Sequence, residues 1–164
     1  MVLSLVLALV LCGWAARRLG TGRVEAWLLI ASIGVILAAT LAPRPFGVES
    51  HPSGIMTCDL SRIGPASLAT YLKFNDPALN IVLFIPLGVA LGQLDRRQHR
   101  GRLVAAAVML PVGIELTQAL VVPLGRACQG GDVFDNLTGL FVGLVIGAAF
   151  HHGMRSVAPG TGGQ

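Results

Sequence analysis

The chain has few charged and few aromatic side chains for its length of 164 residues. Charged residues make up 12% of the sequence and aromatic residues 5%, whereas hydrophobic residues make up 54%. Soluble domains carry roughly 25% charged residues, so this composition argues against a soluble globular protein. The alternative is a soluble helical protein with unusually apolar helices, and the lengths of the apolar runs count against it.

The sequence also lacks the motifs of several functional classes. No Ser–His or Cys–His arrangement typical of a nucleophilic enzyme is present, and no cluster of metal ligands accompanies the polar residues described below. The net charge of +4 comes without a basic patch interleaved with aromatic residues, so nucleic acid is not an expected partner. We therefore expect no cofactor and no metal site.

What the sequence does contain is five long apolar runs. A helix needs roughly 20 predominantly apolar residues to cross a bilayer, and the runs approach or reach this length. We predict an all-α, polytopic bundle of about five transmembrane helices in one domain, 1–152, followed by a disordered glycine-rich tail, 153–164. A long outer loop is expected at 43–77. The predicted spans are 2–16, 26–42, 78–94, 103–123 and 137–150.

The basic residues set the expected orientation of the bundle. Eight of the 12 Lys and Arg residues fall on one side of the predicted spans, and four fall on the other. The positive-inside rule then places the N-terminus outside and the C-terminus in the cytoplasm, with the connections 43–77 and 124–136 facing outward. The first run is expected to be an uncleaved anchor, because its arginines follow the apolar residues instead of preceding them. A multi-pass membrane protein in contact with membrane lipids is predicted.

The two connections that are expected to face outward each contain a cysteine. An oxidising exterior would permit a disulfide between Cys58 and Cys128, and two free thiols are the alternative. The longer connection also contains the segment 65–74, with a proline at its start and apolar residues at helical spacing. It is either a short interfacial helix or a plain loop.

Polar residues occur inside or beside the predicted spans. Asp76 and Asn80 are four residues apart and so share one face of a helix. Asp76 precedes Pro77, which predicts a helix N-cap with proline at the first helical position. Asn80 lies one turn further into the membrane, where capping does not explain it.

The fourth run contains a carboxyl group within the membrane. Glu115 and Gln118 share a helix face, and Glu115 lies roughly 12 Å along the helix from Pro123. A carboxyl group at this depth must be neutral, paired or in contact with water. Glu115 is therefore either hydrogen-bonded to Asn80 or Gln118 between helices, or it serves as an acid, a base or an anchor for a polar ligand.

The last connection and the fifth run repeat the pattern of the third. Asp132 and Asn136 have the same four-residue spacing as the earlier Asp and Asn. Arg126 is the arginine nearest to them in the sequence. It either pairs with Asp132 or Glu115, or it captures an anionic head group.

A stripe of small residues follows at Gly139, Gly143 and Gly147. Glycines at every fourth position allow a neighbouring helix to approach closely. Packing inside the bundle is the favoured interpretation, and an oligomer contact through the same three glycines is the alternative.

Three ordered motifs thus lie between residues 43 and 150. They are Asn80-x-x-x-Phe84-x-Pro-x-Gly88, Glu115-x-x-Gln118, and Arg126 followed by Asp132-x-x-x-Asn136-x-x-Gly139-x-x-x-Gly143. In these residues and their order the chain resembles the VanZ-like family of bacterial membrane proteins.

The resemblance implies a small integral membrane protein of the bacterial envelope. The founding member of the family is associated with resistance to teicoplanin, a glycopeptide that binds cell-wall precursor. No reaction is established for the family, so the resemblance implies no catalytic residue. The chain departs from the commonest family pattern between Arg126 and Asp132, where Cys128 and the pair Gly130-Gly131 leave the loop geometry open.

Two functional hypotheses follow. In the first, a polar pocket beneath the outer surface binds or shields a lipid-linked cell-wall precursor, a glycopeptide or another cell-envelope group, and so affects glycopeptide susceptibility. In the second, the protein is an intramembrane enzyme that acts on a lipid-linked head group with Glu115 as acid or base. A transporter is less favoured, because the five spans show no inverted repeat. The predicted pocket residues are Asn80, Glu115, Gln118, Arg126, Asp132 and Asn136.

Overall fold

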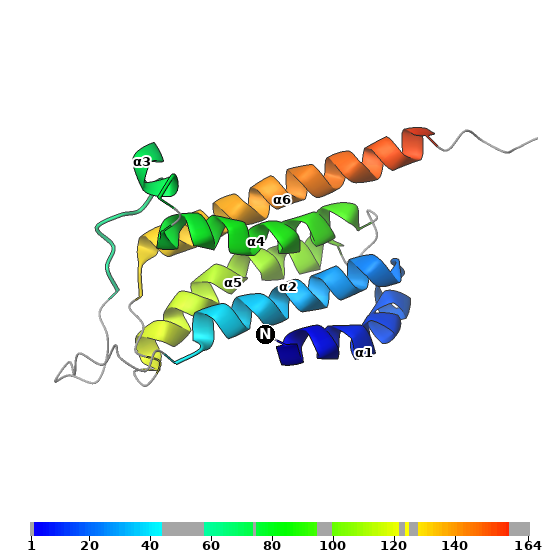
Figure 1. The fold of residues 1–164 in the computed structure, drawn as a ribbon, viewed down its shortest axis with the longest axis horizontal. Coiled ribbons are helices and arrows are strands. Elements are labelled where there is room, and N and C mark those ends of the chain that lie inside the picture. The colour runs from blue at the N-terminus through cyan, green and yellow to red at the C-terminus, as the bar shows by residue number, and fades with distance from the viewer. Residues whose placement is uncertain are drawn as a thin grey trace, which may run out of the picture.

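The fold is a bundle of helices (Figure 1). The structure, a computed structural model, describes residues 2–43, 58–73, 75–94, 100–121, 124 and 128–157, with side chains up to residue 153. The all-α prediction is confirmed. The helices are α1 (Val2–Leu19), α2 (Arg23–Leu41), α3 (Leu68–Tyr71), α4 (Asp76–Gln93), α5 (Arg100–Leu120) and α6 (Gly130–Val157).

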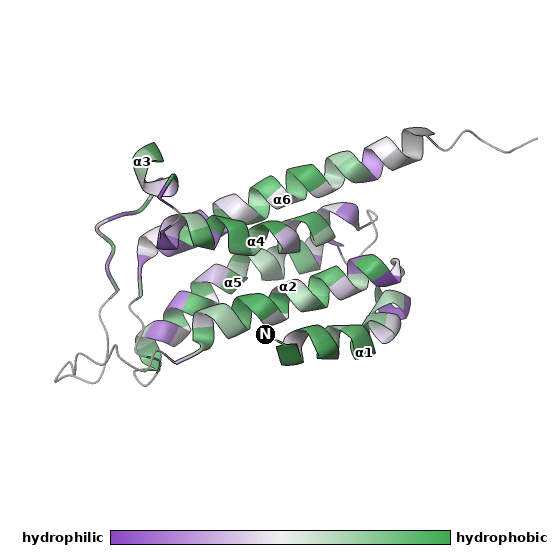
Figure 2. Ribbon diagram, in the orientation of Figure 1, coloured by the Kyte–Doolittle hydropathy of each residue, from purple (hydrophilic) through white to green (hydrophobic). Residues whose placement is uncertain are grey.

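Five of these helices are long and apolar enough to cross a membrane, and only the four-residue α3 is too short. Their outward faces are apolar, as in Val10, Met109 and Phe141, which are 72%, 60% and 67% exposed. Figure 2 shows this as green colour along the long helices. A bundle with apolar side chains on its outside fits hydrocarbon as its surroundings, and the chain is a multi-pass membrane protein.

The long helices do not contribute equally to the packing. The most extensive contact joins α4 and α6, which lie side by side in Figure 1. The other face of α4 contacts α2, and α5 packs against α6, α2 and α4. The first helix packs mainly against α2, so it lies at the edge of the bundle.

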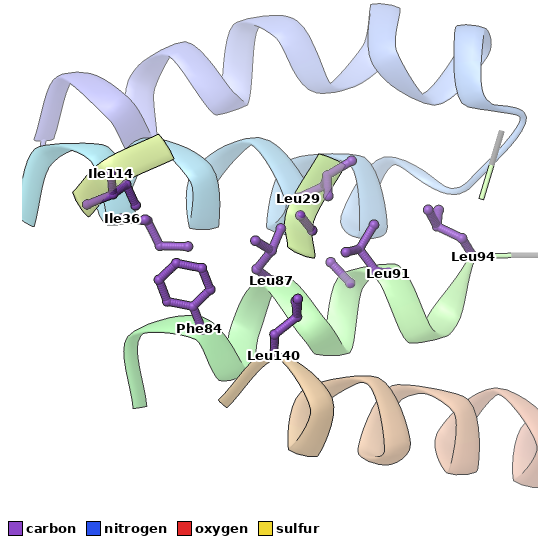
Figure 3. Close-up of a cluster of buried hydrophobic side chains, with 10 residues drawn as sticks. Leu29, Ile36, Phe84, Leu87, Leu91, Leu94, Ile114 and Leu140 are labelled. Carbon is purple, nitrogen blue, oxygen red and sulfur yellow. The ribbon is translucent and has the colours of Figure 1, made fainter. Parts of the chain in front are cut away.

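The apolar core lies between α2, α4 and α5, with α6 closing one side (Figure 3). Phe84, Leu87 and Leu91 project from one face of α4 and are at most 1% exposed. They meet Ile36 of α2 and Leu140 of α6, which are equally buried. This core holds four of the five long helices together.

The contact between α4 and α6 depends on glycine. A Cβ atom on Gly139, Gly143 or Gly147 of α6 would collide with backbone atoms of α4. The two helices therefore approach closely because side chains are absent at these positions. An oligomer that used the same stripe would have to displace α4. The facing pairs are Gly139 with Ile81, Gly143 with Gly88, and Gly147 with Gly92.

Several helix ends differ from the prediction. Helix α6 was expected to span 137–150, but it runs from Gly130 to Val157, so the tail predicted to be disordered from residue 153 starts as helix. The polar residues after Gly130 favoured a loop in the sequence, yet they are paired or buried inside the bundle. Helix α5 ends at Leu120 instead of residue 123, which leaves Glu115 only about 8 Å from the helix end.

The predicted cap of α4 is also wrong by one residue. The N-cap is Asn75, whose side chain makes no capping hydrogen bond, and Asp76 lies in the first turn with Pro77 after it. The Asp76 carboxylate still interacts favourably with the positive end of the helix dipole.

The C-terminal ends of α2 and α5 meet the N-terminal ends of α4 and α6 at one end of the bundle, at the left in Figure 1. We call this end the polar end, and hydrophilic residues gather there in Figure 2. The opposite end carries the junction of α1 and α2 and the start of α5. Its basic residues include Arg17, Arg18, Arg23, Arg100 and Arg102.

Candidate polar pocket

A cavity of about 420 Å³ lies at the polar end of the bundle, between α2, α4, α5 and the start of α6. Five of the six predicted pocket residues line it. The sixth, Arg126, lies outside the described residues. The polar side chains of the lining are Thr40, Asp76, Asn80, Glu115, Gln118, Gln129, Asp132 and Asn136.

Glu115 is buried in the wall of this cavity, with 6% of its surface exposed. One carboxyl oxygen, Oε2, accepts a hydrogen bond of 2.7 Å from the backbone N–H of Gln129. The sequence had suggested Asn80 or Gln118 as its partner, but the partner is the backbone that leads into α6. Glu115 therefore links the end of α5 to the start of α6.

Gln118 is buried one turn further along α5, with 5% of its surface exposed. Its Nε2 donates to the backbone carbonyl of Thr40, 2.9 Å away at the end of α2. The Thr40 hydroxyl in turn donates to the carbonyl of Ile36 at 2.7 Å. These bonds satisfy polar groups at the end of α2, and they use the Gln118 amide and the Thr40 hydroxyl within the protein.

Asp132 and Asn136 enter the cavity from α6, one helical turn apart. Asn80 of α4 interacts with the Asp132 carboxylate, so the two Asp-x-x-x-Asn motifs meet across the α4–α6 contact. Asn136 is 1% exposed, and its side-chain oxygen Oδ1 has no hydrogen-bond partner in the described part of the chain. A buried acceptor without a partner is uncommon in folded proteins and calls for an explanation.

The arginine beside this acidic group is Arg62, which is distant in the sequence and which the analysis above did not select. Its Nη2 lies 2.7 Å from Oδ2 of Asp135 and 3.9 Å from Oδ1 of Asp132. Its Nη1 donates to the carbonyl of Gly64 at 2.8 Å. The hydrogen bond to Asp135 raises the pKa of the Arg62 guanidinium.

Asp135 is a second residue that the sequence analysis did not select. It is fully buried, and both carboxylate oxygens are used: Oδ2 by Arg62 and Oδ1 by the Tyr71 hydroxyl, which donates at 2.7 Å. Partial burial, together with this hydrogen bond, raises the pKa of Tyr71, so the hydroxyl stays a donor at neutral pH. A buried Asp next to Asn136 in an otherwise apolar helix was the signal available in the sequence.

The segment that carries Arg62 and Tyr71 is joined to the start of α6 by a disulfide between Cys58 and Cys128. The sequence had left this pairing open. Backbone hydrogen bonds of 2.9 Å run from Asp59 N–H to the Cys128 carbonyl and from Gly130 N–H to the Asp59 carbonyl. We call residues 58–73 the outer strap, after the outward orientation that the sequence predicts for this segment. It includes α3, so the helix expected within 65–74 is present but only four residues long.

The strap also explains the glycine pair at the start of α6. A Cβ atom on Gly131 would collide with the Arg62 guanidinium, and one on Gly130 would lie 3.1 Å from the Leu60 side chain. Glycine at these positions lets the strap lie directly against the first turn of α6. Cys128, Gly130 and Gly131 thus all contact the outer strap.

The arrangement separates two sets of polar groups. On one side of α6, Asp135 is paired by the strap. On the other side, the cavity holds the carboxyl groups of Asp76, Glu115 and Asp132, with no Lys or Arg among its described lining residues. In the described part of the chain no group of three or more His, Cys, Asp or Glu residues is placed to hold a metal ion. The cavity can accept hydrogen bonds from a polar ligand.

The comparisons with known proteins give one match. A family model described as VanZ/LLP1 matches residues 27–151, which run from the first turns of α2 nearly to the end of α6. No curated protein and no solved structure matches the chain. All five described pocket residues fall inside the matched region, and the whole of α1 falls outside it.

Proposed function

The chain belongs to the VanZ-like family of membrane proteins, and we propose that its cavity binds or shields a lipid-linked or other cell-envelope polar group. The site would lie on the outer side of a bacterial plasma membrane. By this route the protein would affect susceptibility to glycopeptide antibiotics such as teicoplanin, with which the founding member of the family is associated.

The burial of polar side chains around one cavity carries this proposal. Polar and ionisable residues inside a membrane are costly, and they are kept where they pair with one another or serve a site. Glu115, Gln118 and Asn136 are each at most 6% exposed and belong to two different helices, yet all line the same cavity. Packing alone does not require three such residues to face one empty volume.

Two independent features support an outward orientation of the polar end. The side of the spans opposite the polar end carries eight of the 12 Lys and Arg residues, and the side of the polar end carries four. The positive-inside rule therefore favours the opposite side as the cytoplasmic one. The disulfide between Cys58 and Cys128 belongs to the polar end, and disulfides persist in oxidising compartments. Neither argument uses the other, and both favour the same orientation.

An intramembrane enzyme is the second candidate, and the position of Glu115 is what favours it. A buried carboxyl group on a cavity wall is placed where a general acid or base would be needed. No nucleophile accompanies it among the described lining residues apart from the Thr40 hydroxyl, which is hydrogen-bonded to the backbone. Binding is therefore the function that the geometry supports best.

The two candidates are separated by Glu115→Gln, tested in a bacterial host that expresses the chain and is challenged with teicoplanin. Binding predicts a graded loss of tolerance and no change in lipid products. Catalysis predicts complete loss and a lipid substrate that accumulates and is detected by mass spectrometry. Arg126→Lys, compared in parallel, reports whether that arginine takes part.

Protein abundance in the membrane must be measured for each variant, because a structural role would lower it. Glu25→Gln is a matched control, since Glu25 lies in the first turn of α2 at the opposite end of the bundle. If Glu115→Gln and Arg126→Lys both behave like the unmodified chain at normal abundance, the proposal is wrong.

A further inference from the structure

The described lining of the cavity is rich in hydrogen-bond acceptors. Three carboxyl groups line it, from Asp76, Glu115 and Asp132. Two of the donors beside them are used inside the protein: the Gln129 backbone N–H is bonded to Glu115, and the Gln118 amide is bonded to Thr40. A ligand that brings hydrogen-bond donors of its own would therefore suit this lining.

An independent observation points the same way. Asn136 also lines the cavity, is 1% exposed, and has a side-chain oxygen with no partner in the described part of the chain. Because an orphaned buried acceptor is costly, a donor supplied by a ligand would stabilise it. The acceptor belongs to an amide, so the need for a donor does not rest on the carboxylates alone.

The nearby arginine does not remove this need. Arg62 approaches Asp132 only to 3.9 Å, while two of its nitrogens are hydrogen-bonded to Asp135 and to the Gly64 carbonyl. Asp135 is fully buried and closer to the guanidinium, so the ion pair of Arg62 with Asp135 is stronger than its interaction with Asp132. In the described part of the chain, no other Lys or Arg forms an ion pair with the carboxyl groups of Asp76, Glu115 or Asp132.

The geometry favours an organic cation over a metal ion. A bound Ca²⁺ needs six to eight oxygen ligands within about 2.6 Å, and Mg²⁺ needs an octahedral set at shorter distance. The described residues contain no group of three acidic, His or Cys side chains placed closely enough for this. An ammonium group has three donors and can bridge acceptors that are further apart.

We infer that the cavity recognises a primary ammonium group, carried either by a lipid head group or by a soluble amine. Asp132 and Glu115 would supply the charge, and Asn136 Oδ1 would accept one of the N–H bonds. The inference rests on the proposed function, because it names the ligand class of the same cavity.

The test uses the purified full chain in detergent micelles that contain phosphatidylethanolamine and phosphatidylglycerol with identical acyl chains, and native mass spectrometry counts the retained lipid. We expect phosphatidylethanolamine to be preferred. Asp132→Asn, which keeps the side-chain shape, should reduce the preference about tenfold, the loss expected when one hydrogen bond to a charged group is removed. Glu25→Gln should leave the preference unchanged.

A second arm identifies the source of the ammonium group. Free ethanolamine is added to protein freed of lipid, and its binding is measured by calorimetry. Ethanolamine bound in the absence of any lipid preference would support a soluble amine. Lipid preference without ethanolamine binding would support a head group. Asn136→Leu provides a second variant if Asp132→Asn does not yield folded protein, and it should also weaken binding.

The outcomes that overturn the inference are distinct from those that overturn the proposed function. If the chain retains phosphatidylglycerol equally or better, and Arg126→Gln loses this retention, the cavity recognises an anion. The proposed pocket would then be kept, and the ammonium ligand would be wrong. If folded Asp132→Asn and Asn136→Leu retain the same lipids and bind the same amines as the unmodified chain, the pocket itself has no binding role.

Discussion

Asp135 and Asn136 are neighbours on α6, and both are buried, but their surroundings are opposite. Asp135 has both carboxylate oxygens paired, by Arg62 and Tyr71 of the outer strap. Asn136 faces the cavity, and its side-chain oxygen has no partner in the described part of the chain. Successive residues point about 100° apart around a helix, so one side of α6 carries a satisfied structural network while the other lines the cavity proposed as a site.

This difference teaches how to separate stability from function among the buried polar residues. A group whose partners are all supplied by the chain stabilises the fold, and removing it leaves those partners unpaired. A group that lacks a partner contributes little to the free energy of folding or opposes it. The proposed function accounts for such a group by a partner outside the chain.

The largest expected effect comes from breaking the paired side. Asp135→Ala should lower the free energy of unfolding by about 3 kcal/mol, because it removes the buried partner of Arg62 and leaves the Tyr71 hydroxyl without an acceptor for its proton. The measurement is reversible unfolding in mixed detergent micelles. Asp59→Asn is the control, since Asp59 is exposed and should change stability little. A loss no greater than that of the control would show that the network does not stabilise the fold.

The second-largest effect on stability is expected from the disulfide, which also belongs to the paired side of α6. Cys58→Ser should cost about 2 kcal/mol, because the bridge closes a loop of 70 residues and holds the strap on α6. Cys12→Ser, at the free cysteine of α1, is the matched control. Equal unfolding curves for the two variants, or free thiols at both positions in protein from an oxidising compartment, would contradict this account.

A smaller effect is expected where the strap crosses α6. Gly131→Ala should cost about 1 kcal/mol, because the new Cβ displaces the flexible Arg62 guanidinium from its position. Gly113→Ala in α5 meets no atom within 4 Å and should be neutral or slightly stabilising, as expected for alanine within a helix. Similar unfolding free energies for the two variants would mean that Arg62 does not lie against Gly131.

The smallest effect on stability is expected on the cavity side of α6. Measuring it tests the contrast between Asn136 and Asp135. Asn136→Leu should change the free energy of unfolding by less than about 1 kcal/mol, because it removes an acceptor that has no partner. The same variant should lose teicoplanin tolerance in the expressing host. A loss of stability as large as that of Asp135→Ala would show that Asn136 is structural, and the contrast between the two residues would be wrong.

Much of the fold was predictable because apolar length alone identifies helices that cross a membrane. The five long helices were found in this way, and the close packing of α4 and α6 was indicated by glycines at every fourth position. The start of α6 was missed, since Asp132 and Asp135 in the sequence look like solvated loop residues. In the fold these carboxylates interact with residues from distant parts of the chain instead of water. The local sequence gives no indication of such distant partners.

The site was predictable to a similar degree and for a similar reason. Helical spacing placed Asn80, Glu115 and Asn136 on faces that could meet, and all three line the cavity. Arg62 was missed because it pairs with Asp135 across 73 residues of sequence. Proximity in the sequence favoured Arg126 instead, and that residue lies outside the described part of the chain.

The orientation of the polar end is the claim on which the account depends most, and cysteine labelling tests it directly. Ser61→Cys in the outer strap and Arg102→Cys at the start of α5 are both exposed positions at opposite ends of the bundle. Each is made in a Cys12→Ser background and treated in intact cells with a maleimide that cannot cross the membrane. The account predicts labelling at position 61 and none at 102 until the membrane is opened. Labelling at 102 alone would place the cavity on the cytoplasmic side and contradict it.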